Sequence, residues 1–270
     1  MEIRVLGPLT AVVNGVSIVP SAAKPRQILA LLALNSGRVV TVPALMEELW
    51  GPDLPRSAAT TLQTYILQLR RKLVTAMAPA EGSAKDVLLT RHGGYQLDAP
   101  PGAIDAQEFD RLTAEGYAAY DMDAPDEAAR LLTRALDLWS GHALVDVHQG
   151  RLLEIEVLRL QESRLAALER RIDADLRLGH HHEVLGELAG LAAQYTMHEN
   201  LHAQFMLALY RCGRVSRALE AYQRLRDALV EELGLEPSAR LRQLHQLILV
   251  ADPQLDDTLG VRVVEPRMVG

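Results

Sequence analysis

Residues 60–73 read TTLQTYILQLRRKL, and this stretch decides how the N-terminal part of the chain is interpreted. At ~100° per residue, one face of the expected helix is apolar and carries Leu62, Ile66, Leu69 and Leu73, with Tyr65 at its edge. The opposite face carries Ser57, Thr60, Thr64, Gln68 and Arg71, and the two flanks carry Arg70 and Lys72. No Asp or Glu occurs between Ser57 and Val74. The pattern predicts an amphipathic helix with an uncharged polar side that ends in cations.

These residue types suit a helix that lies in the major groove of DNA. The groove is about 12 Å wide and admits one α-helix, so short hydroxyl and amide side chains can reach base edges. An Arg can bond a guanine in bidentate fashion, a Thr methyl can contact a thymine methyl, and flanking cations can hold phosphates. We therefore predict four base-contacting residues: Thr60, Thr64, Gln68 and Arg71. The alternative is an ordinary solvated face, since most polar residues lie at protein surfaces.

Basic residues at two other places in the predicted fold favour DNA binding. Lys24 and Arg26 stand where the first expected helix begins, a place that favours anions. Arg91 lies beside the Gly93-Gly94 turn of an expected hairpin, as in a wing that contacts DNA. The predicted contacts with phosphate, or through the wing, are therefore those of Lys24, Arg26, Arg70, Lys72, Arg91 and Gly93.

The order of elements in residues 1–98 predicts a winged helix-turn-helix domain. Short β-prone runs fill the first 20 residues, and Asn14-Gly15 between two of them is a strong hairpin signal. Three helical patterns follow: the first ends near Gly37, and Thr41 and Ser57 are N-cap candidates for the other two. A second hairpin, DVLLTRHGGYQLDA, completes the domain. Three strands, three helices and a hairpin make the response-regulator type of this α+β fold.

Residues 99–104 (APPGAI) are predicted to be a linker, and residues 105–252 an all-α domain. Val184 and Ala218 stand alike in loop-then-helix contexts 34 residues apart, which is the tetratricopeptide period. A third copy near Ala128 is off-period, so an inserted helix is expected around residues 157–179. The fold class is thus a winged helix-turn-helix followed by tetratricopeptide-like helical repeats. Residues 253–270 are expected to form a loosely ordered tail.

Charge is distributed unevenly along the 270 residues. The chain carries a net charge of −7, but residues 1–100 hold 10 Lys and Arg against 7 Asp and Glu, and the remainder holds 18 against 28. This asymmetry is expected when only one part meets a polyanion. No segment has the length of a membrane span or the pattern of a secretory signal, and the single Cys212 fits a reducing compartment. We expect a cytoplasmic protein associated with the nucleoid.

Other motifs do not predict chemistry. Consecutive histidines at 180–182 point in different directions on a helix start, so no metal site is expected. Cys212 has no evident base beside it in the sequence, and acids spaced two apart diverge on a helix. Trp50 and Trp139 follow apolar helical spacing and are expected in the core. No catalytic residue, cofactor or metal is predicted.

The sequence resembles the antibiotic regulatory proteins of actinomycetes. The resemblance rests on LWGPDLPRSAATTLQTYILQLRRKL with RHGGYQL, and on RLAALERRIDADLRLG with the segment from residue 201 to 238. It implies a bacterial transcriptional activation domain after the winged domain, and a non-enzymatic activator of a secondary-metabolite gene cluster. It also implies binding to tandem direct repeats near the promoter −35 element, beside a second copy, with contacts to RNA polymerase and its sigma factor. The absence of a Gly-x-x-x-x-Gly-Lys-Ser/Thr motif suggests the short form without an ATPase.

The resemblance has one departure and leaves two alternatives. YTMHENLH at residues 195–202 replaces the turn expected there, so no specific contact is transferred to it. One alternative is a helical-repeat adaptor for protein partners with a degenerate winged domain. The other is a repressor that uses the same contacts with double-stranded promoter DNA.

Overall fold

The computed structural model describes residues 1–77 and 83–255, and the chain divides into two compact units. Unit 1 comprises Met1–Ala114 and Arg134–Ala166, and unit 2 comprises Glu115–Thr133 and the described residues from Ala167 onward. The predicted loosely ordered tail falls almost wholly on residues 256–270, which lie outside the described residues.

An antiparallel sheet opens unit 1, with strands in the order β1-β2-β3. The strands are β1 (Glu2–Arg4), β2 (Thr10–Val13) and β3 (Val16–Ser17). Asn14 and Gly15 join the last two with φ angles of 50° and 79°. Left-handed conformation at both positions is what a tight hairpin turn requires, and Asn and Gly adopt it most readily. The hairpin predicted from these two residues is confirmed.

Three helices follow: α1 (Ala23–Leu34), α2 (Val42–Trp50) and α3 (Ala58–Ala76). The Thr41 side chain accepts a hydrogen bond from Ala44 N, so the predicted cap of α2 is confirmed. Ser57 precedes α3, but its side chain makes no cap hydrogen bond. The apolar residues predicted to face inward on α3 are buried: Leu62, Ile66, Leu69 and Leu73.

The second sheet forms the wing, with strands in the order β4-β6-β5. These strands are β4 (Val40–Thr41), β5 (Leu88–Arg91) and β6 (Gly94–Leu97). A Cβ at Gly94 would lie 2.3 Å from the carbonyl oxygen of Val40, so only glycine permits this close strand pairing. The predicted hairpin is therefore present, and with the helices it gives the winged helix-turn-helix fold.

The start of the hairpin differs from the prediction. Residues Ala84–Val87 form a one-turn helix, α4, and strand β5 begins only at Leu88. A capping box explains the helix, since Ser83 accepts from the backbone and the Asp86 carboxylate accepts from Ser83 N.

Residues 137–150, within the domain predicted to be all-α, are not helical. They form turns between α6 (Pro125–Leu136) and α7 (Arg151–Arg177). Part of their backbone bonds to the first segment of the chain: Ser140 N donates to Leu6 O at 2.9 Å and Leu144 N to Gly7 O at 2.7 Å. These long-range bonds replace the helical ones, which no local pattern could indicate.

Three carboxylates, of which that of Glu48 is buried, join the winged elements to the residues that follow them in unit 1. Glu48, on α2, is 3% exposed and lies at the N-terminus of α7. Its carboxylate accepts hydrogen bonds from the backbone N–H groups of Gly150 at 2.6 Å, Leu152 at 2.9 Å and Leu153 at 3.1 Å. The first N–H groups of a helix have no partner within it and favour negative charge. Glu48 thus caps α7 from a different part of the chain.

Asp105 and Asp146 make similar connections. Asp105 begins α5 (Asp105–Asp121) and accepts from Val5 N at 2.8 Å and Leu6 N at 3.0 Å. Burial raises the pKa of Asp105, although these hydrogen bonds act in the opposite direction. Asp146 accepts from Leu9 N at 2.7 Å.

Ala103 and Ile104, within the predicted linker, are buried, and Ile3 N donates to Ala103 O. The domain boundaries proposed from the sequence stay a prediction.

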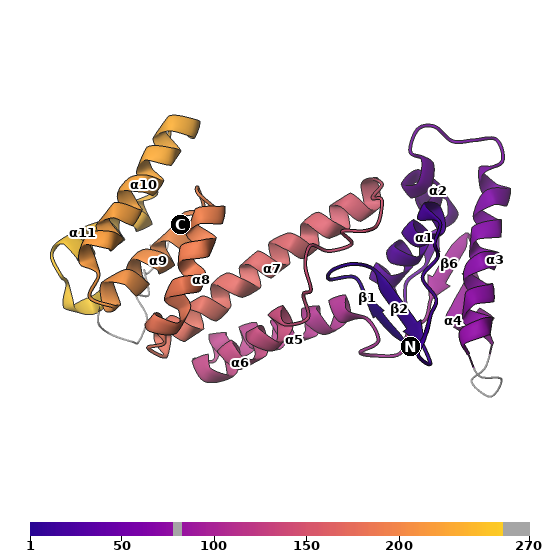
Figure 1. Ribbon diagram of the computed structural model, residues 1–270, viewed down its shortest axis with the longest axis horizontal. Helices are drawn as coiled ribbons and strands as arrows, with labels where there is room; N and C mark the ends of the chain where they lie inside the picture. The colour runs from indigo at the N-terminus through magenta and orange to yellow at the C-terminus, as the bar shows by residue number, and fades with distance from the viewer. Residues whose placement is uncertain (78–82, 256–270) are drawn as a thin grey trace, which may run out of the picture. The chain divides into compact units, whose positions relative to one another are not determined.

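Unit 2 consists of helices packed as antiparallel neighbours (Figure 1). After α7 come α8 (His181–Gln194), α9 (Glu199–Arg211), α10 (Val215–Leu233), α11 (Ala239–Leu249) and a short 3-10 turn, Pro253–Leu255. The residues that suggested a repeat are buried: Ala128, Leu132, Val184, Leu188, Ala218 and Tyr222. Helix α7 covers most of residues 157–179, where the off-period spacing predicted an inserted helix.

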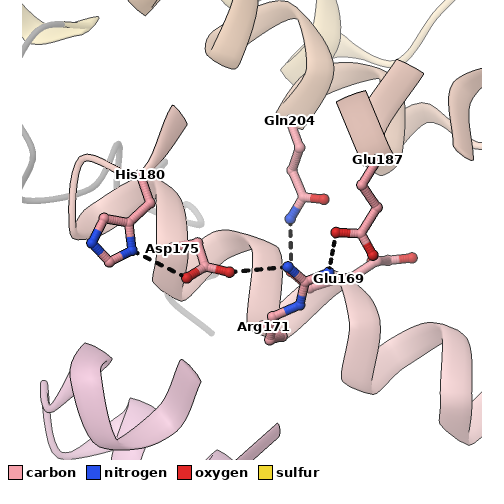
Figure 2. A network of polar contacts seen from close by, with 6 residues as sticks. All are labelled: Glu169, Arg171, Asp175, His180, Glu187 and Gln204. Atoms are coloured by element: carbon pink, nitrogen blue, oxygen red, sulfur yellow. Dashed lines mark hydrogen bonds and ion pairs between the residues drawn. The ribbon is translucent and has the colours of Figure 1, made fainter. Parts of the chain in front are cut away.

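Polar contacts fix α7 against its neighbours in unit 2 (Figure 2). The Arg171 guanidinium bonds Asp175, one turn along the same helix, at 3.1 Å, and also bonds Glu187 of α8. Gln204 of α9 donates to the carbonyl oxygen of Glu169 at 2.8 Å. Because Arg171 is largely buried, these contacts act as structural links and not as a solvent-exposed charge cluster.

We expect Glu48→Ala to lower the free energy of unfolding of unit 1 by about 2–3 kcal/mol, because it leaves three backbone donors without their acceptor. Glu47→Ala is the matched control, since Glu47 is exposed and its ion pair with Arg151 contributes less than about 1 kcal/mol. Urea denaturation of both full-length variants measures the difference. Equal stability of the two variants would contradict the structural role of Glu48.

Candidate nucleic-acid interface

The exposed face of α3 carries the four residues predicted to contact bases. Thr60, Thr64, Gln68 and Arg71 are all exposed, while the opposite face is buried in the domain. The Thr64 hydroxyl donates to the Thr60 carbonyl oxygen at 3.0 Å, which orients its methyl group and leaves its oxygen able to accept. The structure therefore brings these side chains together on one accessible side of one helix.

The same face carries three residues that the sequence analysis did not assign. Gln63 is exposed, and so are two apolar side chains, Leu67 at 48% and Val74 at 64%. Leu67 follows Thr64 by three positions and precedes Arg71 by four, so it lies on the surface between them. Its angular position on the helical wheel was a sufficient signal to find it.

Arg70 joins α3 to the wing. Its Nε and Nη2 donate to the carbonyl oxygen of Leu88 at 3.0 and 2.7 Å, and Nη2 also donates to the Thr90 hydroxyl at 2.8 Å. A guanidinium used in this way fixes strand β5 of the wing beside the helix. Arg70 was also predicted to contact phosphate. That contact stays a prediction, and the same side chain already bonds Leu88 and Thr90.

The next two cations differ from Arg70 in exposure. Arg71 is exposed and Lys72 is half-buried. Because the helix has no acidic residue, its carboxylate-free surface extends over its whole length of 19 residues. The last turns of α3 therefore present positive charge without an acid of the same helix to neutralise it.

The wing ends in an exposed turn. Arg91 and His92 are exposed, and Gly93 has a φ of 75°, a left-handed conformation that favours glycine. Arg91 Nε donates to Gln96 Oε1 across the hairpin at 2.9 Å. The guanidinium is thus held beside the tip of the wing.

The two cations at the start of α1 both have partners within unit 1. Lys24 Nζ lies 4.5 Å from the centre of the Trp50 ring, and Trp50 is half-buried and not in the core as predicted. Arg26 Nη1 lies 3.1 Å from the carbonyl oxygen of Asp146 and 3.2 Å from its carboxylate. Phosphate contacts by Lys24 and Arg26 stay predictions, and both side chains have structural roles.

The residues examined for other chemistry do not form a catalytic arrangement. Among the described residues no group of three His, Cys, Asp or Glu side chains could hold a metal ion. No base was expected beside Cys212, but His182 Nδ1 lies 3.4 Å from its sulfur, so that expectation was wrong. Burial nevertheless raises the pKa of the Cys212 thiol, and a reactive thiolate needs the opposite shift. Trp139 is buried against Phe109 in an edge-to-face contact, as expected for a core residue.

Comparison with known proteins agrees with this fold. Residues 18–97 match the family described as "Transcriptional regulatory protein, C terminal", and residues 104–249 match "Bacterial transcriptional activator domain". The regulatory protein DnrI of Streptomyces peucetius is 56% identical over 257 residues, covering 95% of this chain and 94% of that protein. The chain belongs to the antibiotic regulatory protein family.

More distant members of the antibiotic regulatory protein family and their relatives extend the comparison. The transcriptional regulator RedD of Streptomyces coelicolor is 37% identical over 257 residues, or 94% of this chain and 72% of that protein. The solved structure of Mycobacterium tuberculosis EmbR with a low-affinity phosphopeptide matches 96% of this chain and 68% of that one, at 30% identity and a TM-score of 0.87. The protein is a transcriptional regulator and not an enzyme. Within the described residues, no helix combines the length and apolarity needed to span a membrane.

Adjacent arginines of the regulator should differ in their effect on stability. We expect Arg70→Ala to lower the free energy of unfolding by about 1–3 kcal/mol, because the Leu88 carbonyl and the wing lose a charged donor. Arg71→Ala, on the exposed face, should change it by less than about 0.5 kcal/mol. Urea denaturation measures both, and an equal loss in the two variants would refute the distinction.

Proposed function

We propose that the protein activates transcription of a secondary-metabolite gene cluster by sequence-specific binding to promoter DNA. The observation that carries this proposal is the exposed face of α3, which is mainly polar, free of carboxylates and backed by a buried apolar face. In this proposal α3 lies in the major groove, where it contacts bases through Thr60, Thr64, Gln68 and Arg71.

The contacts with phosphate fall to the cations nearest this face. Lys72 lies on α3 at the border of its exposed face, and Arg91 lies at the wing tip beside the exposed Gly93. Lys24, Arg26 and Arg70 have structural partners, so in the proposed complex they contribute mainly electrostatic attraction. The net charge of −7 does not oppose binding, because it arises from the residues after the winged domain.

Further parts of the proposal follow from the family. Protomers bind tandem direct repeats near the −35 element, about one helical turn (~34 Å) apart so that both meet the same face of the DNA. The helices after the winged domain contact RNA polymerase and its sigma factor, and the match to a bacterial transcriptional activator domain supports this assignment. The protein then works in the cytoplasm, associated with the nucleoid.

Footprinting on the promoters of neighbouring biosynthetic genes tests the proposal, with single-round transcription by purified polymerase holoenzyme on the same DNA. Protected direct repeats beside the −35 element and increased transcript support it. Protection that overlaps the core promoter with less transcript indicates a repressor. No protection on any promoter, with a folded protein, indicates the adaptor with a degenerate winged domain.

Two neighbouring variants separate base contact from phosphate contact. Arg71→Ala should weaken binding by about 1–3 kcal/mol and relax the preference at one base pair, because it removes a bidentate contact. Lys72→Ala should weaken binding to all sequences alike and reduce the slope of log affinity against log salt by about one. Electrophoretic shifts over a salt series, with single-base operator variants, measure both effects. If both variants lose affinity without any change in sequence preference, the assigned roles are wrong.

A further inference from the structure

An apolar side chain stands in the middle of the face proposed to meet DNA. Leu67 is 48% exposed although the domain has a well-packed core, and its neighbours on this face are polar. At ~100° per residue, Leu67 lies on the exposed arc between Gln63 and Gln68, within about 20° of Thr60. Leu67 is therefore one of the side chains that would face the floor of a groove.

Leu67 has no role in the fold that requires a large apolar residue. The packing of α3 is provided by its buried face, through Leu62, Ile66, Leu69 and Leu73. Isolated exposed leucines are common on protein surfaces, and exposure alone decides nothing. The charge of the surroundings favours DNA, because a carboxylate-free helix face that ends in cations complements a polyanion and disfavours a cationic protein surface.

The major groove offers one apolar group at the level of the bases, the C5-methyl of thymine. A side chain without donors or acceptors cannot hydrogen-bond a base edge, and it leaves unpaired any polar edge that it covers. We infer that Leu67 is a specificity-determining residue that selects thymine by contact with its methyl group. The inference rests on the proposed DNA binding. It adds that one position of the operator must carry a thymine methyl group.

Deoxyuridine tests this inference, because it differs from thymidine only in lacking the C5-methyl group. The probe is a pool of duplexes selected by the full-length wild type from a randomised library, then copied with either thymidine or deoxyuridine. Affinities of the wild type and of Leu67→Ala for both copies complete a double-mutant cycle. Val16→Ala is the matched control, since Val16 is 45% exposed on β3, outside α3.

The wild type should bind the deoxyuridine copy about 4- to 15-fold more weakly, as expected for one or two buried methyl contacts. Leu67→Ala should bind the two copies with nearly equal affinity, and Val16→Ala should behave like the wild type. Single deoxyuridine substitutions should then place the effect at one or two base pairs. Because Leu67 is exposed, its replacement should leave the thermal unfolding midpoint nearly unchanged.

Two results would overturn the inference while leaving the proposed function intact. Equal binding of both copies by the wild type shows that no methyl group is sensed. An equal thymidine preference in the wild type and in Leu67→Ala shows that another residue, such as Thr64, senses it. Failure of the wild type to enrich any sequence from the library would instead overturn the proposed function, and this inference with it.

Discussion

The hydrogen bonds of the Glu48 carboxylate to the N-terminus of α7 join helix α2 of the winged domain to the later residues of unit 1. The carboxylate is buried, it belongs to the middle helix of the winged domain, and it accepts from three backbone donors that no residue of α7 could satisfy. Asp105 and Asp146 repeat the arrangement at the first strands. In each case one carboxylate replaces the water that the exposed N–H groups would otherwise bind. The first part of the activator region is consequently built into the same unit as the winged helix.

Helix α3 is held in place by its own buried face and by Arg70. The apolar face anchors the helix to the core, and the Arg70 guanidinium connects it to the carbonyl oxygen and hydroxyl of β5. The helix and the wing are thereby placed as one surface. This arrangement explains how three consecutive cations can serve different purposes, since successive positions on a helix point about 100° apart.

Electrostatics in this protein are local. Lys24 and Arg26 look like an anion site in the sequence, yet one covers the Trp50 ring and the other bonds Asp146. Exposed cations remain on α3, at Arg71, and at the wing tip, at Arg91, where no acid of the same element opposes them. A regulator with a net negative charge can bind a polyanion in this way, because the field near a surface depends on the nearest groups when salt screens the distant ones.

Elements with local signals could be predicted from the residues alone. Asn14-Gly15 predicted the hairpin through its backbone preference, Thr41 predicted the start of α2 through its side-chain cap, and the spacing of Leu62 and Ile66 predicted the buried face of α3. Other features depend on how the chain folds in three dimensions: the hydrogen bonds of residues 137–150 to the first segment, the caps supplied by Glu48 and Asp105, and the partners of Arg26 and Arg70. Each of these depends on hydrogen bonds or ion pairs between groups that are far apart along the chain. A periodic pattern shows which side of an element is apolar. It carries no information about which distant group forms a hydrogen bond or ion pair with a given polar side chain.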